Sequence, residues 1–298
     1  MKWKGRRRST NVEDQRGMRS SARSGRRISP AMARPLMKFL FSKTGLVIVG
    51  IFLVVSFLTG NNPLTLISQL LSGGAQPTVT ENYQPSAENE ELAQFSTVIL
   101  ADTEDIWNQM LDDYREPTLV LFTENVSSAC GHATAATGPF YCSGDEKLYI
   151  DLSFFEEMEE KLDAPGDFAQ AYVIAHEVGH HIQNLAGTIQ KVHSLKGRVS
   201  EKEFNEASVR LELQADFLAG VWAHHSQKIS RMMEEGDLEE ALNAANAIGD
   251  DRLQKKFQGR VVPDSFTHGT SAQRKRWFKL GFETGDLSKG DTFSATEL

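Results

Sequence analysis

Residues 175–181 read Ala-His-Glu-Val-Gly-His-His, inside a stretch, residues 167–185, whose apolar spacing predicts a helix. Side chains four positions apart in a helix lie one turn apart on the same face, so the imidazoles of His176 and His180 can converge on one metal ion. Glu177 follows the first histidine and projects beside the ion, where its carboxylate can take a proton from an attacking water. So short a motif also arises by chance, and it needs support from elsewhere in the chain.

A second long helix is predicted over residues 203–225, and it carries Glu212 and Asp216 one turn apart. A site with two histidines needs a third protein ligand, and Glu212 is far enough along the chain to return to the first helix. Asp216 could then accept a hydrogen bond from the other ring nitrogen of a ligating histidine. Both acids could instead be solvated, but the apolar residues around them indicate a buried helix, where carboxylates need partners. The sequence therefore predicts a Zn²⁺ site formed by His176, His180 and Glu212.

Two further residues are candidates for the chemistry. His268 lies in a turn before a helix predicted over residues 271–282, and Arg274 lies on that helix. Hydrolysis of a peptide through a tetrahedral intermediate needs a donor that stabilises the oxyanion, and either side chain could provide it from across a cleft. The alternative is an ordinary turn followed by solvated basic residues. His181 points about 100° away from the ligand face, so we expect it to have a structural role.

The chain has two cysteines, Cys130 and Cys142. Outside the cytoplasm, an isolated pair is typical of a disulfide, whereas in the cytoplasm the two thiols would stay reduced. A metal site is less favoured, because two thiolates alone rarely hold zinc. We therefore expect a disulfide. Its loop precedes a strand predicted over residues 147–152 and could line the cleft.

The beginning of the chain differs from the rest in charge. The 298-residue protein has a formal net charge of −8, but residues 1–44 carry 13 Lys and Arg against two acids. In residues 39–58 Lys43 is the only charge, and this 20-residue stretch would span roughly 30 Å as a helix, the thickness of a bilayer's hydrocarbon core. This pattern predicts an uncleaved transmembrane signal-anchor at residues 39–60. A cleaved signal peptide and a buried core helix are the alternatives.

The sequence thus divides into four predicted parts. They are a basic, disordered cytoplasmic arm (1–38), the transmembrane segment (39–60), a linker (61–91) and a folded domain (92–298). Basic residues stay on the cytoplasmic side, so we expect the folded domain outside the cytoplasm, on the periplasmic face of the inner membrane. The membrane segment beside the basic arm argues against nucleic acid as a partner.

A small sheet followed by several helices predicts an α+β domain. Besides the elements already given, helical spacing is present over residues 95–114 and 238–248, and a further short strand is predicted over residues 118–123.

The same motifs resemble known families. His176-Glu-x-x-His180 with Glu212-x-x-x-Asp216 is the pattern of the gluzincins, which include thermolysin. His268-Gly-Thr-Ser-Ala-Gln-Arg274 is similar to the His-Pro-x-x-x-x-Arg element of membrane-bound heat-shock zinc endopeptidases, with Gly269 in place of proline. Over nearly its full length the chain resembles a bacterial family of neutral zinc metallopeptidases. That resemblance is carried by the opening Lys2-Trp-Lys-Gly-Arg-Arg-Arg-Ser, the loop Cys130–Cys142, Leu148-Tyr-Ile-Asp-Leu and His176-Glu-Val-Gly-His-His-Ile-Gln.

The resemblance implies a zincin-like fold and a membrane-anchored, zinc-dependent peptidase that acts on peptides or proteins. A non-catalytic, zinc-stabilised binding or scaffold protein is the alternative. Glu177 argues against that alternative, because a purely structural zinc site has no use for the carboxylate.

Overall fold

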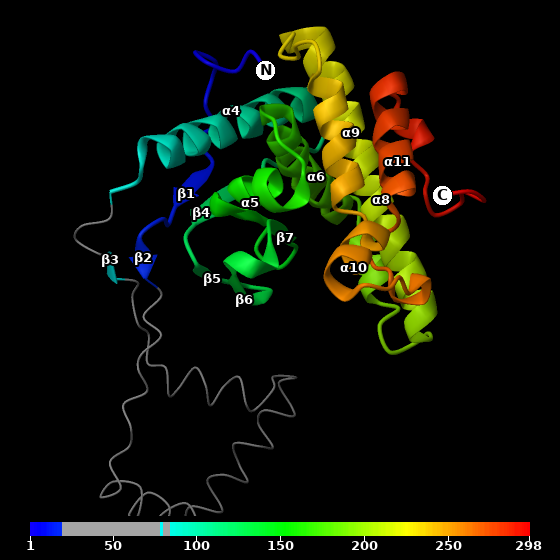
Figure 1. Cartoon of the computed structure of the whole chain (residues 1–298). Coiled ribbons are helices and arrows are strands. Elements are labelled where there is room, and N and C mark those ends of the chain that lie inside the picture. Colours follow the sequence, from blue (N-terminus) through cyan, green and yellow to red (C-terminus); the bar gives the residue numbers. More distant parts are fainter. Residues whose placement is uncertain (20–77, 80–83) are drawn as a thin grey trace, which may run out of the picture. The chain divides into compact units, whose positions relative to one another are not determined.

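The computed structural model describes residues 1–19, 78–79 and 84–298 (Figure 1). The chain forms two units, a larger one of residues 1–17 and 82–298 and a smaller one of residues 18–81. In the smaller unit, β2 (Met18–Arg19) pairs antiparallel with β3 (Thr78–Val79).

The predicted transmembrane segment and most of the predicted linker lie outside the described residues. Among the residues that are described, no helix has the length and apolar character needed to cross a membrane.

The main sheet of the larger unit has the strand order β1-β4-β8-β7. β1 (Val12–Asp14), β4 (Thr118–Phe122) and β8 (Lys147–Asp151) run parallel to one another, and β7 (Phe140–Cys142) pairs antiparallel with β8. The central strands β4 and β8 are buried almost along their whole length, as strands covered on both faces should be. β7 is an edge strand of this sheet.

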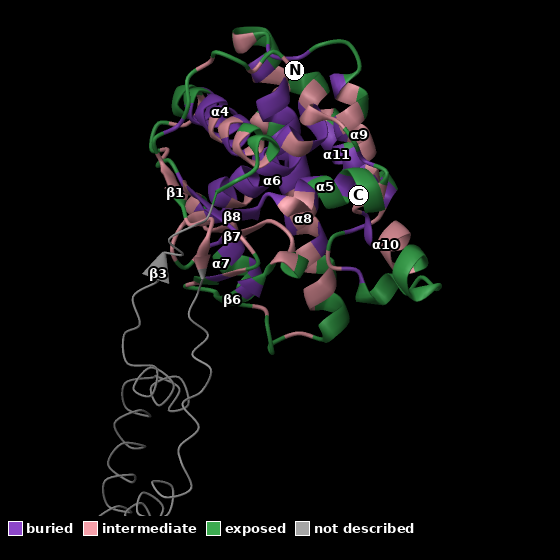
Figure 2. Ribbon diagram, turned by 60° about the vertical axis from the view of Figure 1, so that its left-hand side comes forward, coloured by how far each residue is buried: buried purple, intermediate pink, exposed green. Residues whose placement is uncertain are grey.

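Helices make up most of the larger unit, which confirms the α+β prediction. The eight α-helices of the described residues are α4 (Ala87–Met110), α5 (Ser153–Leu162), α6 (Asp167–Leu185), α7 (Thr188–His193), α8 (Glu201–His225), α9 (Asp237–Ala247), α10 (Asp250–Gln258) and α11 (Ser271–Thr284). The folded part begins before the predicted residue 92, because the side chain of Ser86 accepts a hydrogen bond from the backbone of Asn89 and starts α4 there. In Figure 1, α9 and α11 lie side by side, and Figure 2 shows α6 deeply buried among the other elements.

Close backbone contacts fix α6 and α11 against α8. A Cβ atom at Gly281 of α11 would lie 2.1 Å from the carbonyl oxygen of Phe217, and one at Gly220 of α8 would lie 2.1 Å from that of Phe278. At Gly179 of α6, a Cβ atom would lie 3.0 Å from the carbonyl oxygen of Ala215. The three helices that carry the predicted site are therefore held at close range.

The N-terminal segment is folded, and the prediction of a disordered arm over residues 1–38 is wrong for residues 1–17. β1 pairs with β4 and extends the main sheet, and residues 1–17 belong to the larger unit. The composition of this segment misled the prediction. A segment rich in Arg and Ser was expected to stay solvated. Its polar groups instead form hydrogen bonds and ion pairs with acidic residues of α4.

Glu104 on α4 is the centre of this contact. Its side chain is only 1% exposed, and a buried carboxylate needs partners. Arg7 donates to its Oε2 atom at 3.0 Å, while Ser9 and Asn11 donate to its Oε1 atom at 2.5 and 3.0 Å. Nearby, the ring of Trp3 packs edge-on against Phe95 with centroids 5.4 Å apart. The N-terminal segment thus satisfies a buried charge and is an integral part of the fold.

Candidate metal centre and cleft

The three predicted ligands converge in space. One side-chain atom each from His176, His180 and Glu212 lies within 4.8 Å of the others. The Nε2 atom of His176 is 3.2 Å from Oε2 of Glu212, and the Nε2 atom of His180 is 3.5 Å from Oε1. Two imidazoles and one carboxylate are the donor set of many catalytic zinc sites, which leave a fourth position open.

Hydrogen bonds at the other ring nitrogens prepare both imidazoles for a metal. The Nδ1 atom of His176 is 2.9 Å from Oδ1 of Asp216, and the Nδ1 atom of His180 is 2.9 Å from Oε1 of Gln183. Both partners are acceptors, so each histidine donates through Nδ1. The Nε2 lone pair of each ring is then free to bind a metal ion on the side of Glu212.

Gln183 was missed by the sequence prediction. Its amide nitrogen donates to the carbonyl oxygen of Leu211 at 2.7 Å, so its oxygen faces His180. It lies three residues beyond His180 on α6, a spacing that puts both side chains on one helix face. In the sequence, that spacing was the only indication that Gln183 could contact His180.

The charges of the site suit a divalent cation. Burial alone would lower the pKa of His176, but the neighbouring Asp216 and Glu212 carboxylates outweigh it and raise the pKa to about 9. Burial would likewise raise the pKa of Glu212, yet His180 and His176 hold it well below its ordinary value. The two carboxylates thus favour a positive charge between α6 and α8. A metal ion can supply that charge in place of a proton on His176.

Arg274 is buried beside His176 and also lines the cleft, so its predicted role in oxyanion stabilisation stays a prediction, while its hydrogen bonds indicate a positioning role. Its Nε and Nη2 atoms donate to the two oxygens of Asp216, each at 2.8 Å, and Nη2 also donates to Tyr172 Oη at 3.2 Å. Tyr172 Oη donates in turn to Asp216 at 2.5 Å. All of these side chains are buried. Arg274 fixes Asp216, which orients His176, and it is a positioning residue.

His268 also lies on the wall of the cleft. Its Nδ1 atom is 3.2 Å from Oδ1 of Asp250, and Oδ2 of Asp250 accepts the backbone N–H groups of Thr267 and His268, each at 2.7 Å. The hydrogen bond to Asp250 raises the pKa of His268, which favours the charged imidazolium. The Nε2 atom is then left to donate to a ligand. Asp250 was missed, because its partner is 18 residues away in the sequence.

One face of α6 forms part of a cleft of about 730 Å³. Val173, His176, Glu177 and His180 line it, at the spacing expected for a single helix face. Glu177 is a buried residue, at 7% exposed. In the described part of the chain no hydrogen bond or ion pair engages its carboxylate, which is therefore available to a molecule in the cleft.

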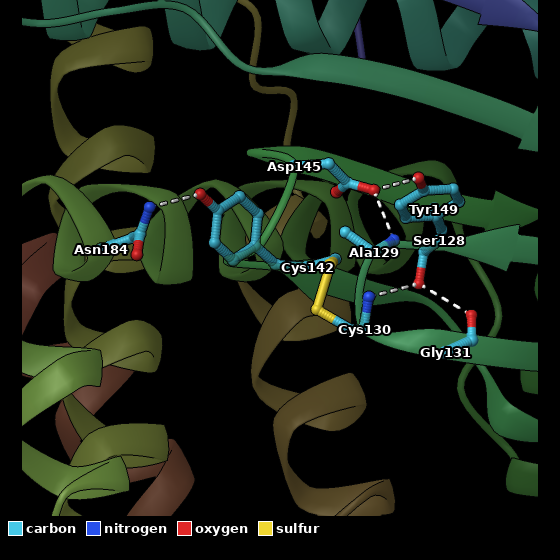
Figure 3. The surroundings of a disulfide bond; sticks show 9 residues. Ser128, Ala129, Cys130, Gly131, Cys142, Asp145, Tyr149 and Asn184 are labelled. Atoms are coloured by element: carbon cyan, nitrogen blue, oxygen red, sulfur yellow. Dashed lines mark hydrogen bonds between the residues drawn. A yellow bond between two sulfur atoms is a disulfide. The ribbon is translucent and has the colours of Figure 1, made fainter. Parts of the chain in front are cut away.

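The edge strand β7 is tied to α6 by a chain of hydrogen bonds. His181 donates through Nε2 to the carbonyl oxygen of Arg115, so its Nδ1 atom accepts from Tyr141 Oη at 3.0 Å. Asn184 donates to the same hydroxyl at 3.0 Å (Figure 3). Burial lowers the pKa of His181, which keeps the ring neutral, as this pattern requires. His181 thus has the structural role that was expected.

The predicted disulfide between Cys130 and Cys142 is confirmed, with an S–S distance of 2.07 Å (Figure 3). Cys142 ends β7, and Cys130 lies in the turn between β5 (Asn125–Ser128) and β6 (Gly131–Thr134). The bond therefore joins a hairpin to the edge strand. Cys130 also lines the cleft, as expected for this loop.

Fold and site together define an α+β protein in which two histidines and one glutamate from two packed helices converge at a cleft, in an arrangement that could hold a metal ion. The chain belongs to a family of zinc metallopeptidases: the family model described as "Putative neutral zinc metallopeptidase" matches residues 1–293.

Relatives share this sequence over long stretches. The protein YpfJ of Escherichia coli strain K12 is 48% identical over 297 residues, which cover 98% of this chain and 99% of that protein. The protein Rv2575 of Mycobacterium tuberculosis is 40% identical over 205 residues, covering 65% of this chain and 68% of that protein. Neither name states an activity. No solved structure matches the chain significantly.

Proposed function

We propose that the protein is a zinc-dependent peptidase with a zincin-like active site. The observation that carries the proposal is the position of Glu177, whose carboxylate has no described protein partner and lies in the cleft beside the three converging ligand side chains. A zinc ion held by His176, His180 and Glu212 would supply Lewis-acid chemistry, polarising the scissile carbonyl and making water a better nucleophile.

The chain's own residues would carry the proton transfers and the positioning. Glu177 accepts a proton from the attacking water and delivers it to the leaving amine. His268, held by Asp250, donates its Nε2–H group to the oxyanion that forms on the carbonyl. The free edge of β7 can pair with the extended backbone of the substrate, as edge strands do in β-augmentation.

The proposed activity depends on the metal. We expect the purified full-length protein to contain about one zinc per chain and to cleave a mixed peptide library, monitored by mass spectrometry. A chelator should abolish cleavage, and added Zn²⁺ should restore it. A protein that holds zinc tightly but leaves every peptide intact would match the scaffold alternative and would overturn the proposal.

Removal of the carboxylate ligand tests the metal site itself. Glu212→Ala leaves two histidines and should lower zinc affinity by well over the roughly 10–100-fold that loss of a supporting hydrogen bond causes. Zinc content after dialysis, measured by atomic absorption, is the readout. Glu206→Ala is the matched control, because Glu206 is an exposed residue of the same helix. Full zinc content in Glu212→Ala would disprove the ligand assignment.

A further inference from the structure

One end of the cleft is markedly apolar. Beyond the metal-ligand residues, toward the N-terminal end of α6, the cleft is lined by Phe154, Leu162, Val173, Ile248, Leu253 and Phe257. These residues come from α5, α6, α10 and the segment before α10. Lys256 of α10 donates to the backbone carbonyl of Lys161 on α5, and Arg252 pairs with Asp163 at 3.6 Å. These contacts hold α5 and α10 next to each other as walls of the apolar end.

Charged groups of this end are already paired. Glu157 and Lys161, both on α5, line the cleft, but their side chains form an ion pair at 3.0 Å. The two opposite charges therefore give this end of the cleft no net charge.

Phe257 is the outermost of the apolar residues, and its side chain is 67% exposed. Val261 and Val262 follow it and are 42% and 38% exposed. Of these three residues Phe257 alone lines the cleft. A large apolar side chain that is exposed at the wall of a cleft is suited to contact an apolar ligand.

We propose that the apolar end of the cleft is a subsite for a large aliphatic or aromatic side chain of the substrate, and that Phe257 is a specificity-determining residue at its outer wall. The inference rests on the proposed peptidase function and names its substrate class, which is polypeptides with a bulky apolar residue near the scissile bond. Bulky side chains would exclude water from the subsite and bury Phe257, and a small or charged side chain would do neither.

Truncation of Phe257 tests the subsite. The substrates are quenched-fluorescent peptides made in pairs, and the two peptides of a pair differ only in having Leu or Ser at one position. Each pair tests a different position near the scissile bond. For the pair whose variable residue enters the subsite, the wild-type protein should cleave the Leu peptide with a kcat/KM about 10-fold or more above that of the Ser peptide, the usual range for a hydrophobic pocket. Phe257→Ala should remove most of that preference and leave the Ser peptide unaffected. Phe293→Ala is the control, since Phe293 is 38% exposed and does not line the cleft.

Binding separates failure of the subsite from failure of the function. In the Glu177→Gln protein, which should not turn substrate over, fluorescence anisotropy of labelled Leu and Ser peptides should show the same preference and the same loss on adding Phe257→Ala. If wild type cleaves peptides but Phe257→Ala keeps the full preference, the subsite proposal is wrong and the function stands. If no peptide is cleaved, the function fails, and equal binding of the Leu and Ser peptides would overturn the subsite as well.

Discussion

Glu177→Gln should keep its zinc and its fold but lose cleavage of peptides by at least about 100-fold, the lower end of what a general base contributes. Glutamine has nearly the same shape as glutamate and cannot accept the proton of the attacking water. The carboxylate makes no described hydrogen bond or ion pair with the protein, so its loss should leave the packing of α6 unchanged. Initial rates of cleavage, zinc content and the unfolding temperature are the three measurements.

Glu156→Gln is the control for this prediction, because it makes the same substitution at an exposed position of α5. It should retain activity within about twofold, as surface substitutions usually have small effects. Wild-type rates in Glu177→Gln would show that Glu177 is not the base. Loss of zinc together with activity would instead assign Glu177 to the metal site.

The candidate metal ligands could be proposed from the sequence because much of their geometry is local. Helical spacing alone places His176 and His180 on one face and Glu212 one turn from Asp216. The long helices were found for the same reason, since a repeated apolar pattern extends over many residues. The short helices α5, α7 and α10 were missed, because a few turns give too little pattern to read.

Residues that depend on tertiary contacts could not be assigned in this way. Asp250 acts through a histidine in a distant turn, and Tyr141 links a strand to α6. Arg274 was correctly predicted to lie near the site. Its partner, Asp216, could not be predicted, because the two residues meet only where α8 and α11 cross at close range. That crossing buries the guanidinium against Asp216. The carboxylate of Asp216 balances the charge of the buried guanidinium, and Arg274 still contributes to the lining of the cleft.

The N-terminal segment creates a conflict between the sequence-based topology and the fold. A single crossing at residues 39–60 would put residues 1–17 in the cytoplasm and the folded domain outside it. The pairing of β1 with β4, and of Arg7 with the buried Glu104, requires both parts in one compartment. Separating them would remove the donors Arg7, Ser9 and Asn11 from the Glu104 carboxylate and would leave one edge of β4 without its partner strand. We therefore predict that residues 1–17 lie on the same side of the membrane as residues 82–298.

Labelling of introduced cysteines can decide the question. Thr10→Cys and Lys202→Cys place a thiol at exposed positions in the N-terminal segment and on α8. With the inner membrane intact, a membrane-impermeant maleimide should react with both variants or with neither, and permeabilised cells should label both. Reaction of both would also place the domain in the oxidising space that the Cys130–Cys142 disulfide suits. If only Lys202→Cys reacts until the membrane is opened, the chain crosses once as its charge pattern predicts. In that case β1 cannot pair with β4 in the cell, and Glu104 must find other partners.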